Sequence, residues 1–216
     1  PERTINFDIH PVGSYREEKR ISEKKVHRKI VDLVFPVTNS FPMTTDGVRT
    51  KTDDLTRFQV EILDFLDTLT ELNVVIKPIP NYSRKVCSVV DTIKHMQHAT
   101  IHEGWSTNAW IKVYEPRALI IELPSTPLFE LMAGDTEIFM LKDTLNPFSE
   151  SALEMLKKRA HIFDDVADLK IAVLEWKSGS LPKLRDQSFY NHYVYKPNTH
   201  DRVIDLVNSL VRHAAN

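Results

Sequence analysis

Residues 164–179, DDVADLKIAVLEWKSG, combine an acidic pair, an apolar run and a Glu-x-Lys sequence. Two carboxylates on adjacent strands can bind a divalent metal ion, and a nearby lysine can orient the water that attacks a phosphodiester. Asp165, Glu175 and Lys177 are of the right types and in the right order for these three roles. Glu150 or Glu154, on a helix that we predict just upstream, would complete the set.

This order of residues is typical of the PD-(D/E)xK nucleases, but two features depart from their pattern. Asp164 stands where those enzymes have proline, and no glycine is available for a hairpin turn between Asp165 and the apolar run. A plain surface strand, with Glu175 and Lys177 exposed and neighbouring apolar residues buried, explains the same residues. We therefore favour the plain strand and keep the metal-dependent nuclease as the alternative.

A second group of possible metal ligands lies in residues 91–105, DTIKHMQHATIHEGW. If this segment is helical, Asp91, His95, His98 and His102 follow one face, because they recur at intervals of four, three and four residues. The three histidines would span about 10 Å along the axis, so they could not share one ion. A pair, His98 and His102, could bind a metal with a distant carboxylate. A polar surface that faces a partner protein is the interpretation we favour.

Composition argues against several functional classes. The 28 basic and 30 acidic residues give a net charge of −2, so the chain as a whole is not built to wrap nucleic acid. Its five glycines are scattered, which argues against a phosphate-cradling loop or a dinucleotide fingerprint. The single cysteine, Cys87, suits a reducing compartment and allows no internal disulfide. No apolar run is long enough for a membrane span, and we expect no cofactor.

The elements that must position these residues are those of an α/β (α+β) protein, in which amphipathic helices pack on a small mixed sheet. We expect a charged N-terminal extension over 1–29, a strand–helix–strand lobe over 30–110 and a mixed α/β lobe over 111–216. The apolar stripe of the last helix, from Val203 to Val211, should point inward. Strands are expected at 29–37, 73–80, 118–123, 137–142 and 168–176, and helices at 53–72, 146–161 and 199–213.

Positive charge gathers at two places that could contact RNA or a partner protein. One is the charged N-terminal arm, and the other is the stretch 181–197, LPKLRDQSFYNHYVYKP, whose tyrosines could stack on bases. A solvated arm and an ordinary strand with aromatic pairing are the alternatives. The candidate contact residues are Lys24, Lys25, Arg28, Lys29, Lys183 and Arg185.

Four segments of the C-terminal half resemble a known family. They are EPRALIIEL at 115–123, LNPFSESALEMLKK at 145–158, DLKIAV at 168–173 and NTHDRVIDLVNSLVRHA at 198–214. Together they are similar to the C-terminal region of a mitochondrion-specific protein of the small ribosomal subunit. The resemblance covers about the last 100 residues, and the stretch EWKSGSLPKLRDQSFYNHYVY is additional to the family's pattern.

The resemblance implies a non-enzymatic structural component of a large ribonucleoprotein, the mitochondrial ribosome small subunit. Its partners would then be other proteins of the assembly and ribosomal RNA, and its location the mitochondrial matrix, with the cytoplasm as the alternative. A near-neutral chain with a charged arm and exposed histidines agrees with a position among other proteins at the rim of such a particle. Whether the chain is an enzyme stays open here, and we lean towards no catalysis.

Overall fold

A computed structural model describes residues 28–37, 52–78, 87–103, 109–142 and 148–214 of the 216-residue chain. Val26–Gln187 form one compact unit, and Ser188–Asn216 belong to a second. Strands from both predicted lobes, 30–110 and 111–216, join in a single sheet of the first unit.

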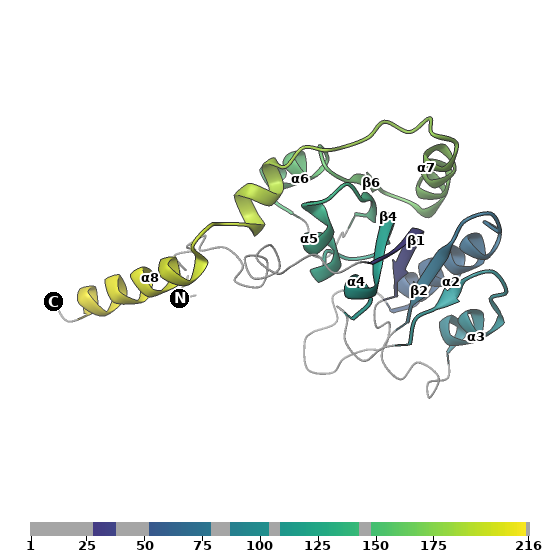
Figure 1. Ribbon diagram of the computed structural model, residues 1–216, viewed down its shortest axis with the longest axis horizontal. Coiled ribbons are helices and arrows are strands. Elements are labelled where there is room, and N and C mark those ends of the chain that lie inside the picture. The colour runs from purple at the N-terminus through teal and green to yellow at the C-terminus, as the bar shows by residue number, and fades with distance from the viewer. Residues whose placement is uncertain (1–27, 38–51, 79–86, 104–108, 143–147, 215–216) are drawn as a thin grey trace, which may run out of the picture. The chain divides into compact units, whose positions relative to one another are not determined.

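The first unit confirms the predicted α/β class, but its sheet is all parallel and not mixed as we expected. Its sheet has six strands in the order β3-β2-β1-β4-β5-β6, and every pairing between neighbours is parallel. Figure 1 shows β4, β1 and β2 side by side. Its strands are apolar nearly throughout, as in VVIK of β2, because a parallel sheet is covered by helices on both faces. The strands are β1 (Lys29–Pro36), β2 (Val74–Lys77), β3 (Thr100–Ile101), β4 (Tyr114–Ile121), β5 (Glu137–Leu141) and β6 (His161–Phe163).

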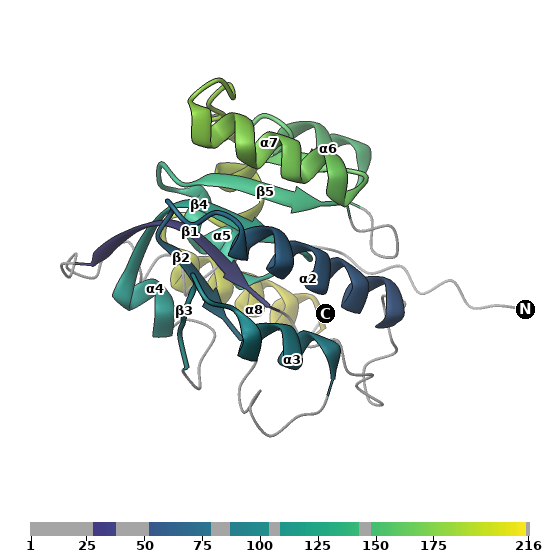
Figure 2. The same ribbon diagram turned by 90° about the vertical axis from the view of Figure 1, so that its right-hand side faces the viewer.

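Helices connect the parallel strands. Crossovers between parallel strands are right-handed. The connection after β1 and the connection after β4 run in opposite directions along the sheet, so their helices lie on opposite faces. In this unit the helices are α2 (Thr52–Asp67), α3 (Ser88–His95), α4 (Ala109–Val113), α5 (Thr126–Met132), α6 (Glu150–Leu156) and α7 (Val166–Ser178). The helix after β1, α2, lies beside α3 (Figure 2).

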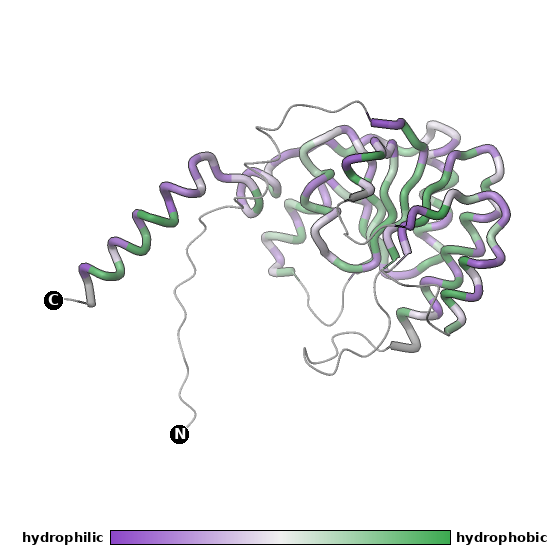
Figure 3. The backbone as a smooth tube through the Cα atoms, turned by 60° about the horizontal axis from the view of Figure 1, so that its bottom comes forward, coloured by the Kyte–Doolittle hydropathy of each residue, from purple (hydrophilic) through white to green (hydrophobic). Residues whose placement is uncertain are grey.

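The main core lies between the sheet and the layer formed by α2, α3 and α7. Leu33 and Phe35 of β1 are fully buried there against Ile62 of α2, and Val173 of α7 belongs to the same cluster. Figure 3 shows the apolar strands gathered in the interior of this unit. Burying each large apolar side chain contributes about 1.5–3 kcal/mol, so this layer accounts for much of the stability.

A buried polar network joins the start of β5 to neighbouring segments. The carboxylate of Glu137 lies 2.6 Å from Nη2 of Arg185 and 3.6 Å from Nε2 of His161. Burial works to raise the pKa of Glu137, but the neighbouring His161 and Arg185 side chains outweigh it and the pKa is lowered. Glu137 therefore stays ionised although it is buried.

The second unit contains a π-helical turn, η2 (Tyr190–Val194), and the final helix, α8 (Thr199–Ala214). The strand considered for 181–197 is therefore wrong at its centre, where the Tyr195 amide donates to the carbonyl of Tyr190 at 2.8 Å. The helix predicted for 199–213 is confirmed, but its apolar stripe does not point inward. The exposed fractions are 40% for Val203, 44% for Ile204, 51% for Val207, 56% for Leu210 and 63% for Val211.

Candidate functional site

The strand order reverses between β1 and β4, and two charged residues flank that point. On one side Pro36 at the end of β1 pairs with Lys77 of β2. On the other side Val34 pairs with Leu119 of β4. If this register is extended by three residues along both strands, Glu122 stands beside Val37. Neighbouring strands are about 4.8 Å apart, so the backbones of Lys77 and Glu122 lie about 10 Å apart across the end of β1.

Glu122 follows β4 directly and is 3% exposed. Its Oε2 accepts a hydrogen bond of 2.8 Å from Nε2 of Gln59, a fully buried residue of α2. This bond links the helix after β1 to the segment after β4, which are the two parts of the chain that border the reversal point. A carboxylate has about four acceptor positions and can accept from hydroxyl and amino groups.

Lys77 is the last residue of β2 and is also 3% exposed. Its Nζ donates to the carbonyl oxygen of Pro78 at 2.5 Å, and no carboxylate within the described ranges forms an ion pair with it. Burial lowers the pKa of Lys77, because the ammonium group loses its hydration. A buried ammonium group without a counter-ion is costly, and such perturbed groups gather at functional sites.

His102 follows β3, the neighbour of β2. Its backbone amide donates to the carbonyl of Ile76 at 2.9 Å, and its ring contacts that of Tyr114 edge-to-face at 5.4 Å. Burial, and then the charge of Lys77, lower the pKa of His102. Its Nε2 is buried without a hydrogen-bond partner in the described part of the chain. Farther along the same edge of the sheet, Lys142 after β5 forms an ion pair of 3.1 Å with Asp164 after β6.

The proposed metal pair His98 and His102 does not have the helical spacing that we expected. α3 ends at His95, because the backbone turns to an extended conformation at Met96. His98 is exposed, and its amide donates to Oδ1 of Asp67 at 2.9 Å, while His102 lies beyond β3. Among the residues that the structure describes, no group of three or more His, Cys, Asp or Glu side chains could hold a metal ion.

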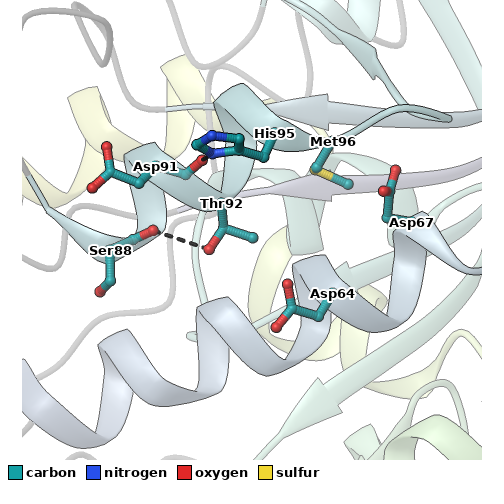
Figure 4. A pocket seen from close by; sticks show the side chains of 7 residues that line it. All are labelled: Asp64, Asp67, Ser88, Asp91, Thr92, His95 and Met96. Atoms are coloured by element: carbon teal, nitrogen blue, oxygen red, sulfur yellow. Dashed lines mark hydrogen bonds between the residues drawn. The ribbon is translucent and has the colours of Figure 1, made fainter.

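An open pocket of about 440 Å³ between α2 and α3 gathers three aspartates near His95 (Figure 4). Two of the lining residues, Asp67 and His95, form hydrogen bonds at the end of α3. Oδ1 of Asp67 accepts from the amide of Gln97 at 2.9 Å, and Nδ1 of His95 lies 2.6 Å from the carbonyl oxygen of Asp91. The lining residues are Asp64, Asp67, Ser88, Asp91, Thr92, His95 and Met96.

The predicted strand at 168–176 is wrong, because this segment belongs to helix α7. Asp165 caps the helix: its Oδ1 accepts from the amide of Asp168 at 2.9 Å, and Gly179 ends the helix with φ 79°. Glu175 lies ten residues after Asp165, which is about 15 Å along a helix axis. Lys177 forms an ion pair with Glu71. The two-strand arrangement that would bring Asp165, Glu175 and Lys177 to one metal is therefore absent.

The other candidate contact residues divide between occupied and exposed positions. Arg28 donates from Nη1 to the carbonyl of Ile111 at 3.3 Å, and its Nη2 lies 3.6 Å from Glu115. Arg185 is held by Glu137, whereas Lys29 and Lys183 are exposed. Lys24, Lys25 and the rest of the extension up to residue 27 lie outside the described residues. Contact of these residues with RNA or a partner stays a prediction.

Our sequence analysis missed Gln59, Lys77 and Glu122. A weak signal was present, because apolar runs end in a charged residue in VVIK and in ALIIE. Strand ends of this kind meet at one edge of a parallel sheet, where ligands bind in doubly wound folds.

The comparisons with known proteins assign no family. No family model matches the chain, and no curated protein has significant similarity to it. None of the helices in the described ranges is long and apolar enough to cross a membrane.

Proposed function

We propose that Val26–Gln187 bind a phosphorylated small molecule of the nucleotide type in the crevice at the carboxyl ends of β1 and β4. In open parallel sheets ligands bind at the point where the strand order reverses, and the order found here is that of doubly wound nucleotide-binding folds. Fold alone does not carry a function. The observation that carries the proposal is that two buried residues of opposite charge, Lys77 and Glu122, stand at the carboxyl ends of β2 and β4, on the two sides of β1.

The chemistry of this pair matches a nucleotide better than an apolar ligand. An ammonium group attracts a phosphate, and a carboxylate accepts from ribose hydroxyls or from an amino group of a base. The chain lacks the glycine fingerprint with which dinucleotide folds bring their backbone to a pyrophosphate. Side chains at the strand ends must therefore supply the specific contacts.

The test is thermal unfolding and calorimetric titration of the full chain with ADP, GDP, UDP, CDP and NAD. At least one nucleotide is expected to stabilise the fold, by about 2.7 kcal/mol when present at a hundred times its Kd. Glu122→Gln keeps an acceptor for Gln59 but removes the charge, so it should weaken that nucleotide at least about tenfold. Glu154→Gln, at an exposed position of α6, is the matched control and should bind as wild type does.

Two results would contradict the proposal. One is the absence of any stabilisation by the five nucleotides at millimolar concentration. The other is equal affinity in Glu122→Gln, Glu154→Gln and wild type, because the bound nucleotide would then lie away from the reversal point.

A second candidate function, a structural component of a ribonucleoprotein assembly, is favoured by α8. Five large apolar side chains of this helix are exposed, and an exposed apolar stripe of this size is typical of a surface that binds a protein. If the chain has this structural role, a tagged form should co-sediment with ribosomal particles. The double variant Val207→Asp, Leu210→Asp should no longer co-sediment with them. Co-sedimentation of the double variant at the wild-type level would count against α8 as the attachment.

A further inference from the structure

Lys77 and His102 form a cross-strand pair on one face of the sheet. Ile76 pairs with Ile101, so the next residues of β2 and of the segment after β3, Lys77 and His102, lie opposite each other about 4.8 Å apart. Side chains alternate along a strand, and Ile76 and Ile101 face the core formed with α2 and α3. Lys77 and His102 therefore both point to the opposite face.

Both side chains have hydrogen-bonding capacity that the described residues do not use fully. The one hydrogen bond of the Lys77 ammonium group goes to the carbonyl of the adjacent Pro78, and two of its three donors remain. Nε2 of His102 is buried without a partner, while the edge-to-face contact with Tyr114 fixes the plane of the imidazole. Buried polar atoms are nearly always paired in folded proteins, and a ligand that bears acceptor oxygens can pair with both side chains.

The position of the pair identifies the part of the ligand that it meets. In doubly wound sheets that bind dinucleotides, an acidic residue beyond the first helix accepts from the ribose hydroxyls, and a cation in its place accommodates a phosphate. In this chain the end of β2 carries a lysine, with a histidine beside it on the next strand. A tetrahedral oxyanion can accept from both side chains at once, whereas a ribose hydroxyl pair would leave the ammonium charge without compensation.

We infer that Lys77 and His102 form a phosphate subsite of the crevice and hold a phosphate group of the ligand on the β2–β3 side of the reversal point. The inference rests on the proposed function and adds to it where the ligand's phosphate lies. Glu122 lies on the other side of β1 and on the face that α2 covers, where Gln59 donates to it.

The experiment uses the full chain, inorganic pyrophosphate as the probe and titration calorimetry at constant ionic strength. Lys77→Met is close in volume and removes only the charge and donors, and Lys77→Arg retains both. Lys94→Met, at an exposed position of α3, is the control for net charge. Wild type, Lys77→Arg and Lys94→Met should bind pyrophosphate, and Lys77→Met should bind it at least about tenfold more weakly. His102→Gln should weaken pyrophosphate binding about tenfold or less, because the variant replaces one neutral side chain that can donate with another.

The outcomes separate this subsite from the proposed function. Equal pyrophosphate affinity in wild type and Lys77→Met, or no binding by wild type, would overturn the subsite, even if a nucleotide binds with the expected dependence on Glu122. Loss of pyrophosphate binding in Lys77→Met, together with normal thermal unfolding of that variant without ligand, would establish the subsite. Absence of any Glu122-dependent nucleotide binding would then refute only the proposed function.

Discussion

Replacing Arg159 with methionine is expected to lower the free energy of unfolding by about 3 kcal/mol or more, because several buried carbonyl groups lose their donors together. Arg159 is fully buried, and its guanidinium donates to Met132 at 2.9 Å, Gly134 at 2.8 Å and Thr136 at 2.9 Å. These carbonyls belong to the last residue of α5 and to the turn that leads to β5. Burial lowers the pKa of Arg159 to about 10, so the group stays charged at neutral pH.

Urea denaturation followed by far-UV circular dichroism measures this change. The matched control is Lys158→Met, which alters the neighbouring, exposed residue and should change the free energy of unfolding by no more than about 0.5 kcal/mol. If both variants unfold at the same urea concentration, the cost of burying the guanidinium cancels its hydrogen bonds, and Arg159 does not stabilise the turn.

The second large effect is expected for Phe139→Ala, which should lower the free energy of unfolding by about 3–5 kcal/mol. Phe139 is fully buried in β5, and its ring centroid lies 5.5 Å from that of His161, 6.5 Å from Phe163 and 6.2 Å from Trp176. Truncation would leave a cavity where β5, β6 and α7 meet. The loss includes both the transfer of the ring from water and the aromatic contacts.

Thermal unfolding monitored by tryptophan fluorescence measures this change, and Trp176, one of three tryptophans in the chain, contacts the ring edge-on. Ile171→Ala is the matched control on α7: this side chain is 55% exposed and its truncation should cost less than about 1 kcal/mol. A loss for Phe139→Ala as small as that for Ile171→Ala would show that the aromatic cluster packs too loosely to couple α7 to the sheet.

Much of the fold could be predicted from the sequence alone. Apolar runs bounded by polar residues marked the strands that became β1, β2, β4 and β5, and the apolar spacing from Leu55 to Leu66 marked α2. The prediction failed at 168–176, because a short apolar run such as IAVLEW has no period that separates a buried strand from a helix. The decisive signals were the helix caps, Asp165 before the run and Gly179 after it.

The candidate site was less accessible to sequence analysis. Residue types alone suggested Asp165 with Glu175, and His98 with His102, but both pairings assumed a local secondary structure that the chain does not adopt. Lys77 and Glu122 are 45 residues apart in the sequence, and no motif connects them. Their separation in the sequence does not predict that they lie at the same edge of the sheet, because strand pairing and not local structure brings them there.

The amino-acid sequence by itself determined which segments are apolar enough to become strands, that helices alternate with them, and that glycine-built phosphate loops are absent. The order of the strands came from tertiary packing. β1 takes the centre because the crossovers after β1 and after β4 lead away from each other, and the right-handed twist fixes the face on which each helix packs. Only this arrangement brings the last residue of β2 and the first residue after β4 to the same edge, where we propose that a ligand binds.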